Sequence, residues 1–83
     1  MTRDDIYSML SDYFTGKFEV PTEKITREAN LFKDLGLDSI DALDMIAMLE
    51  SKLSITVEED DLKKIKTVAD IVEYIHTAVQ AEA

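Results

Sequence analysis

Ser39 offers the clearest chemistry in this 83-residue sequence. It lies in the string GLDSID (residues 36–41), just ahead of hydrophobic residues with helical spacing. At the start of a helix, a serine ordinarily caps the first turn or lies within it. It becomes a nucleophile only where a base stands within hydrogen-bond reach and N–H donors surround the oxyanion. The chemistry of Ser39 therefore depends on what the rest of the chain places around it.

The chain supplies little for catalysis by Ser39. Its only histidine, His76, falls at the flank of a predicted C-terminal helix, and residues 36–41 lack the Gly-x-Ser-x-Gly elbow. The absence of cysteine excludes disulfides, thiolate metal sites and a cysteine nucleophile. We therefore predict no catalytic role for Ser39 and reject a hydrolase. Ser39 can still be the substrate of another enzyme, because backbone N–H groups and the helix dipole favour a phosphoryl group there.

Negative charge is concentrated around this serine. The chain has 18 acidic and 9 basic residues, a net charge of −9, and all but one unit of that charge lies between Asp34 and Asp61. An acidic chain disfavours nucleic acid and anionic membranes, because these polyanions select lysine and arginine. The concentration allows two interpretations, a well-solvated surface or a docking surface for basic partner proteins.

Helical spacing and capping patterns predict four helices. A threonine followed three residues later by an acid, the spacing of a capping box, occurs at Thr2, Thr56 and Thr67. Asp38 or Ser39 can cap a further helix. No alternation long enough for a β-strand occurs, so we predict an all-α fold, a small four-helix bundle of three longer helices and one short helix. The predicted helices span roughly residues 3–15, 38–53, 57–64 and 67 onward.

Residues 16–37 form a long first loop. Gly16 is the expected stop of the first helix, since glycine tolerates the left-handed conformation, and Gly36 is expected to turn the chain into the serine-headed helix. A loop this long ordinarily packs on the core or serves a function. Spaced apolar residues predict packing; they are Phe18, Val20, Ile25, Leu31, Phe32, Leu35 and Leu37.

The whole chain, residues 1–83, is expected to be a single domain with a frayed end at residues 79–83. Its apolar runs are too short to span a membrane, and its first residues lack the features of a signal peptide. We accordingly expect a cytoplasmic monomer with no stable membrane insertion.

The serine-headed helix carries one hydrophobic stripe more than folding requires. At about 100° per residue, one group clusters on a core-facing side; it consists of Ala42, Met45, Ile46, Leu49 and Leu53. A second group, edged by Asp44 and Glu50, lies near the azimuth of Ser39; it consists of Ile40, Leu43 and Ala47. This second stripe is either a surface kept for a partner or one that the long loop covers.

The sequence around Ser39 resembles the phosphopantetheine attachment site of acyl carrier proteins. The matching string is DLGLDSID (residues 34–41), followed by LDM at 43–45. The similarity extends over nearly the whole chain, from the opening helix to the closing segment 67–75. It implies that Ser39 receives a 4'-phosphopantetheine arm from coenzyme A through a separate Mg²⁺-dependent phosphopantetheinyl transferase. The thiol of the arm would carry acyl groups as thioesters between enzymes of fatty acid or related acyl biosynthesis. The chain itself would then be a carrier and not an enzyme, with no catalytic residue and no structural metal of its own, because the Mg²⁺ belongs to the transferase.

The resemblance also implies roles for the neighbours of Ser39. Asp38 matches the motif acid of the family, and Ile40 replaces the usual leucine after the serine, a volume-conserving change. The inward stripe and the last helix would wall a cavity that shelters the acyl chain. The partner-facing apolar positions would be Ile40, Leu43 and Ala47. The acidic positions that recognise basic docking patches on partner enzymes would be Asp41, Asp44 and Glu50.

Two other functions stay open at this point. The arm could carry a polyketide, aminoacyl or peptidyl group instead. The chain could also be an unmodified helical adaptor in which Ser39 only caps its helix. A basic turn at Lys63, Lys64 and Lys66, more basic than in typical fatty acid carriers, suggests a specialised carrier.

Overall fold

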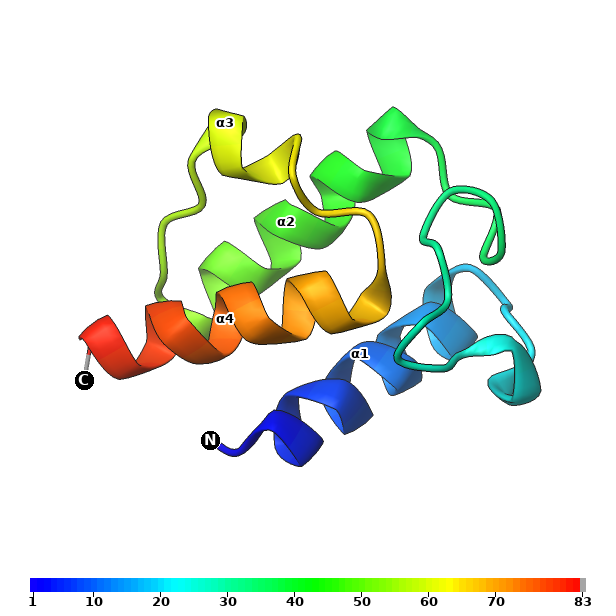
Figure 1. Cartoon of the computed structure of the whole chain (residues 1–83), viewed down its shortest axis with the longest axis horizontal. Coiled ribbons are helices and arrows are strands. Elements are labelled where there is room, and N and C mark those ends of the chain that lie inside the picture. The colour runs from blue at the N-terminus through cyan, green and yellow to red at the C-terminus, as the bar shows by residue number, and fades with distance from the viewer. Residues whose placement is uncertain (83) are drawn as a thin grey trace.

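The computed structural model describes residues 1–82, and over this range the chain folds into helices joined by loops (Figure 1). This confirms the predicted all-α class, with three longer helices and one short one; a 3-10 turn and a β-bridge between Asn30 and Thr67 are added. Within the described residues, no helix is long and apolar enough to cross a membrane. The elements are α1 (Arg3–Lys17), η1 (Thr22–Lys24), α2 (Ser39–Leu53), α3 (Glu59–Leu62) and α4 (Val68–Glu82).

The core lies between the three long helices. α1 and α4 pack against each other, and α2 runs diagonally behind α4 in the view of Figure 1. Burial of one large apolar side chain contributes roughly 1.5–3 kcal/mol, so this cluster is the main source of stability. The side chains with no exposed surface include Ile6, Leu10 and Phe14 of α1, Met45 and Leu49 of α2, and Val68, Ile71 and Ile75 of α4.

Local capping defines where α1 and α4 begin. The hydroxyl of Thr2 accepts a hydrogen bond from the Asp5 N–H, and the Asp5 carboxylate accepts one from the Thr2 N–H, both at 3.1 Å. The hydroxyl of Thr67 accepts from the Asp70 N–H at 3.2 Å, and the Asp70 carboxylate accepts from the Thr67 N–H at 3.1 Å. Both capping boxes are therefore confirmed.

The capping box predicted at Thr56 is wrong. α3 begins only at Glu59, and its preceding residue Glu58 makes no side-chain capping bond. The N–H of Val57 donates instead to the Glu50 carboxylate at 3.1 Å. Because a side chain distant in sequence satisfies this backbone donor, the chain stays outside a helix there and α3 is shorter than expected.

α1 continues past Gly16, the residue at which the helix was predicted to end. The helix ends at Lys17, and the left-handed residue that follows is Glu19, with φ 56°. Phe18 packs its ring edge-on against the ring of Tyr13, with centroids 5.6 Å apart. Aromatic packing thus extends the helix beyond the glycine.

α4 reaches Glu82, beyond the residue at which fraying was expected to start. Val79 is partly buried and packs against the core, which favours helix up to that point. Ala83 lies outside the described residues, and fraying of the last turn in solution stays a prediction.

The long loop packs on the core, as predicted. The N–H of Leu31 donates to the Lys66 carbonyl at 2.8 Å, and the N–H of Leu37 donates to the Leu31 carbonyl at 3.0 Å. Gly36 has φ 75°, so it makes the expected turn into α2. Phe32 departs from the prediction, with 40% of its surface exposed. The buried residues of the loop are Val20, Ile25, Ala29, Leu31, Leu35 and Leu37.

Candidate functional site

Ser39 is the first residue of α2, and Asp38 caps the helix in front of it. The Asp38 carboxylate accepts a hydrogen bond from the Asp41 N–H at 2.8 Å, and the Asp41 carboxylate accepts one from the Asp38 N–H at 3.3 Å. Of the two residues considered as the cap, Asp38 is the one used. The side chain of Ser39 is therefore released from that role.

The hydroxyl of Ser39 is exposed and, among the residues that the structure describes, has no hydrogen-bond partner. His76 lies elsewhere on α4, with its Nε2 3.2 Å from the amide nitrogen of Gln80. Among the described residues, the backbone N–H groups of Ser39 and Ile40 have no acceptor, as is usual for the first-turn donors of a helix. This end of α2 can hold an anionic group on the serine, but it offers no base to ionise the hydroxyl.

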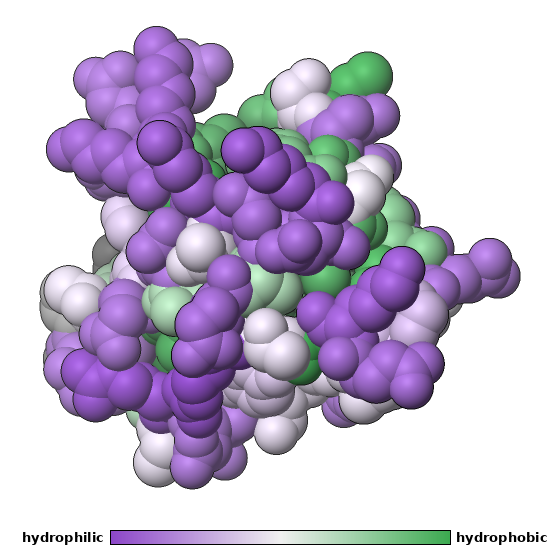
Figure 2. Space-filling model, turned by 45° about the vertical axis from the view of Figure 1, so that its right-hand side comes forward, coloured by the Kyte–Doolittle hydropathy of each residue, from purple (hydrophilic) through white to green (hydrophobic). Residues whose placement is uncertain are grey.

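The second hydrophobic stripe of α2 is exposed. Ile40 is 68% exposed and Leu43 is 53% exposed, and Ala47 is also exposed. The long loop does not cover these side chains, so that alternative is wrong. In Figure 2, most of the surface is hydrophilic, and hydrophobic surface emerges at the upper right, the side on which α2 begins in Figure 1. An exposed apolar group edged by acids is a surface suited to a protein partner.

The three predicted recognition acids differ in what they do within the chain. Asp44 is exposed, and its carboxylate makes no hydrogen bond to the described residues. Asp41 is partly buried and belongs to the capping box. Glu50 is partly buried and accepts the Val57 N–H, so its carboxylate has a structural contact that the sequence did not indicate.

Comparison with known proteins identifies the family. The sequence profile described as "Phosphopantetheine attachment site" matches residues 10–75. An acyl carrier protein of Thermotoga maritima is 40% identical over 74 residues, which span 89% of this chain and 91% of the relative. The chain belongs to the acyl carrier protein family.

Solved structures agree with this fold. An acyl carrier protein from Enterococcus faecalis superposes with a TM-score of 0.79 at 27% identity, over 94% of this chain and 99% of that one. A crystal structure of an acyl carrier protein from Thermotoga maritima superposes with a TM-score of 0.85, over 98% of this chain and 94% of that one. Since the second alignment is 23% identical, it supports the fold alone.

This acyl carrier protein is a non-catalytic carrier of covalently attached 4'-phosphopantetheine. The start of α2 fits such a group: the hydroxyl of Ser39 is exposed, and two unpaired N–H donors lie at the positive end of the helix dipole. An attached phosphodiester would find hydrogen-bond donors there without displacing the Asp38 cap. The fit therefore requires no rearrangement of α2.

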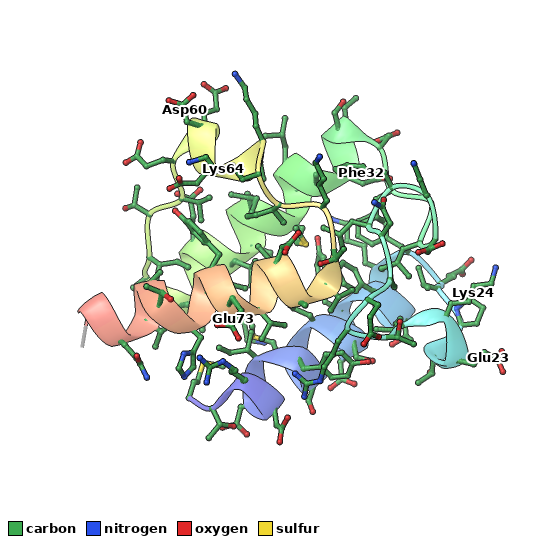
Figure 3. All side chains as sticks on the ribbon, viewed as in Figure 1. Glu23, Lys24, Phe32, Asp60, Lys64 and Glu73 are labelled. Carbon is green, nitrogen blue, oxygen red and sulfur yellow. The ribbon has the colours of Figure 1, made fainter. Side chains whose placement is uncertain are left out.

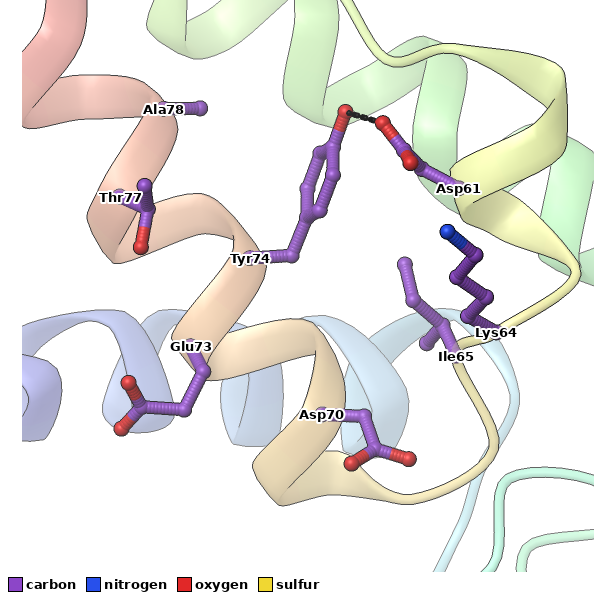
Figure 4. A pocket seen from close by; sticks show the side chains of 8 residues that line it. All are labelled: Asp61, Lys64, Ile65, Asp70, Glu73, Tyr74, Thr77 and Ala78. Atoms are coloured by element: carbon purple, nitrogen blue, oxygen red, sulfur yellow. Dashed lines mark hydrogen bonds between the residues drawn. The ribbon is translucent and has the colours of Figure 1, made fainter.

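The inward stripe of α2 forms part of a packed core in this acyl carrier protein. Met45 and Leu49 meet α4 in one hydrophobic cluster and have no exposed surface. A groove of about 480 Å³ lies beside this core, between α3 and α4 (Figure 4). Shelter of an acyl chain within the core would therefore require the helices to separate.

Sequence analysis missed two residues that shape this groove, Tyr74 and Asp61. The Tyr74 hydroxyl donates to the Asp61 carboxylate at 3.0 Å, which joins α4 to α3 (Figure 4). Figure 3 shows Lys64 near the short α3 and Glu73 on α4, while Lys24, in η1, lies at the opposite side of the molecule. The sequence carries only a weak signal for Tyr74: it is an aromatic residue with a polar hydroxyl, and it follows Ile71, which is buried, by three positions.

Proposed function

We propose that Ser39 is the attachment point of the 4'-phosphopantetheine arm. The observation that carries the proposal is that Ser39 occupies the first turn of α2 with an exposed, unbonded hydroxyl while Asp38 does the capping. The hydroxyl oxygen bonds to the phosphorus that carries the pantetheine in coenzyme A, the pyrophosphate P–O bond breaks, and adenosine 3',5'-bisphosphate leaves, so that the oxygen becomes the serine side of a phosphodiester. Its proton leaves to a base of the phosphopantetheinyl transferase, because the described part of this chain brings no base to the hydroxyl.

The function of the chain's own residues is to position that oxygen and to hold the phosphodiester. The Asp38–Asp41 pair holds the start of α2, and the N–H groups of Ser39 and Ile40 can donate to phosphate oxygens. When bound, the arm supplies a terminal thiol that holds an acyl group as a thioester. The cargo that best fits the family is an acyl chain of fatty acid or related biosynthesis.

The partner face that we assign surrounds Ser39. Ile40, Leu43 and Ala47 supply exposed apolar surface, Asp44 supplies an exposed carboxylate beside it, and the partly buried Asp41 and Glu50 complete its acidic edge. The transferase and later acyl-transferring, condensing or ligase enzymes would dock here through basic patches. Electrostatic attraction of this kind raises association rates and weakens with salt, so binding is fast and transient.

Incubation with coenzyme A, Mg²⁺ and a broad-specificity phosphopantetheinyl transferase tests the attachment. Intact-mass analysis should show one arm on the wild type and none on Ser39→Ala. Ser51→Ala is the matched control, because Ser51 is an exposed serine at the other end of α2 and should accept no arm itself. An arm on Ser39→Ala, or no arm on the wild type while a known carrier is modified, would refute the proposal.

A further inference from the structure

The segment from Ser54 to Leu62, which links α2 to α3 and contains α3, has few interactions of its own. α3 has four residues, none of them buried, and its N-cap residue makes no side-chain capping bond. A helix of one turn gains little from its own backbone, because nucleation is unfavourable. The stability of the segment therefore depends on contacts from outside it.

Part of this support is apolar packing, since Ile55 is buried and Val57 and Leu62 pack against the core. Two side chains from the neighbouring helices add the polar contacts. The Glu50 carboxylate, on α2, accepts the Val57 N–H at 3.1 Å. The Tyr74 hydroxyl, on α4, accepts the Glu58 N–H at 3.4 Å and donates to the Asp61 carboxylate at 3.0 Å (Figure 4). A tyrosine hydroxyl keeps its proton at neutral pH, and burial raises the pKa of the Tyr74 hydroxyl further, so it remains a donor. Hydrogen bonds thus tether the segment at one point to α2 and at one residue to α4.

One of the tethers belongs to the proposed partner face. Glu50 is partly buried beside the exposed stripe, and its Oε2 holds the Val57 N–H. We infer that Glu50 is a docking-sensitive tether: an arginine of a bound partner competes with Val57 for the carboxylate and so releases residues 54–62 from α2. This inference rests on the partner face described under the proposed function.

The competition follows from hydrogen-bond geometry. A guanidinium binds a carboxylate through two parallel N–H···O bonds and engages both oxygens. Both competing interactions are charge-assisted, because each uses the Glu50 carboxylate, but the guanidinium adds a full positive charge and a second, parallel bond, so the Val57 N–H is the weaker competitor. Release of Val57 leaves Tyr74 as the remaining polar tether beside the apolar packing of Ile55 and Leu62, which makes it easier for the groove between α3 and α4 to widen. Docking on α2 would in this way loosen α3 through the Glu50 carboxylate.

Amide hydrogen exchange measured by NMR tests the tether in the free protein. Glu50→Ala should speed exchange at Val57 roughly tenfold, because a hydrogen bond to a charged acceptor is lost. Glu50→Gln keeps an acceptor oxygen and should stay near the wild-type rate. Asp44→Ala is the matched control: it removes an exposed α2 carboxylate with no hydrogen bond in the structure and should leave Val57 unchanged. Unchanged exchange at Val57 in Glu50→Ala would overturn the inference.

The docked state is tested with Ser39→Ala and a broad-specificity phosphopantetheinyl transferase, so that binding occurs without transfer. Exchange at Val57 and Leu62 should accelerate several-fold on binding, while the resonances of Ile40 and Leu43 shift. Tyr74→Phe, which releases Asp61 beforehand, should tighten docking by about 2–5-fold, since coupling between two equilibria is reciprocal.

The outcomes separate the two proposals. Shifts at Ile40 and Leu43 without faster exchange at Val57 would leave the partner face intact and overturn the tether. Absence of any shift at Ile40 and Leu43 under saturating transferase would overturn the partner face and, with it, the inference. Weaker docking of Tyr74→Phe would also contradict the coupling.

Discussion

Asp38 and Asp41 each accept a hydrogen bond from the backbone N–H of the other, at 2.8 and 3.3 Å. The pair determines where α2 begins, and Ser39 lies between the two aspartates in sequence. Its hydroxyl has no hydrogen-bond partner among the described residues. Because carboxylates cap the helix, the hydroxyl of Ser39 points to solvent with no structural task. The position of the proposed attachment oxygen is therefore set by its two neighbours and not by its own bonds.

Removal of the Asp38 cap should destabilise the protein. Asp38→Ala should lower the free energy of unfolding by about 1 kcal/mol, the usual cost of losing an N-cap. Asp38→Asn keeps an acceptor oxygen and should recover most of that loss. Urea denaturation followed by circular dichroism measures the difference. Asp44→Ala, an exposed α2 carboxylate without a capping bond, should change stability little, and an equal loss there would contradict the capping argument.

Two tyrosines should respond in opposite ways to loss of their hydroxyl groups. Among the described side chains, the Tyr13 hydroxyl is a buried polar group with no partner. Tyr13→Phe should leave the free energy of unfolding unchanged or raise it, because an unsatisfied buried polar atom is removed. Tyr7 donates to the Ile25 carbonyl at 2.6 Å, so Tyr7→Phe should cost about 0.5–1.5 kcal/mol. Equal losses in thermal and urea unfolding would show that Tyr13 has a partner.

Asp70 should make stability depend on pH in the acid range. The backbone N–H groups of Lys66 and then Thr67 hold the pKa of the Asp70 carboxyl below its ordinary value of 3.8. A depressed folded-state pKa stabilises the protein above the unfolded-state pKa, and this stabilisation is lost as the pH falls through the folded-state value. The difference in unfolding free energy between wild type and Asp70→Asn should therefore be largest above about pH 5 and shrink below about pH 4.

Urea titrations of both proteins across that range measure the effect. Val79→Ala, which truncates a partly buried apolar side chain of the same helix, should lower stability by a similar amount at every pH. A constant difference for Asp70→Asn across the range would contradict the role of its carboxylate.

Charge placement, and not total charge, should control docking. Asp44→Lys should lower the second-order rate constant of arm transfer by roughly 3–10-fold, because steering of a basic partner depends on local potential. Asp12→Lys on α1 changes the net charge equally and should have little effect. Stopped-flow or discontinuous mass assays measure the rate constant of arm transfer for each variant at low and high salt. The slowing caused by Asp44→Lys should be smaller at high salt. Equal slowing by the two variants would mean that only net charge matters.

The two stripes of α2 should separate stability from docking. Leu43 is 53% exposed, so Leu43→Ala should change the free energy of unfolding by less than about 0.5 kcal/mol while weakening transferase binding. Leu49 has no exposed surface, so Leu49→Ala should cost about 2–5 kcal/mol. Denaturation and binding titrations on the same samples distinguish the two. Loss of stability in Leu43→Ala would show that the exposed stripe contributes to the core.

Local interactions made much of this protein predictable from its sequence. The capping boxes at Thr2 and Thr67 join residues three apart, and the inward stripe that contains Leu49 repeats every three or four residues. The string around Ser39 likewise placed the serine at a helix start and indicated the family. These features need no knowledge of distant residues, because each is written in a few consecutive positions.

Tertiary structure decided the features that join distant segments. Packing between residues far apart in sequence decides three of these features. They are the exposure of Leu43 beside the long loop, the end of α1 and the start of α3. Glu50 was predicted to be a recognition acid, but only the fold shows that it also holds the Val57 N–H, seven residues away. Tyr74 reaches Asp61 across 13 positions and has no local pattern to reveal it. Sequence alone thus determined the starts of the three long helices and the position of the serine, while the start of α3 and its tethers arose only once the helices had packed.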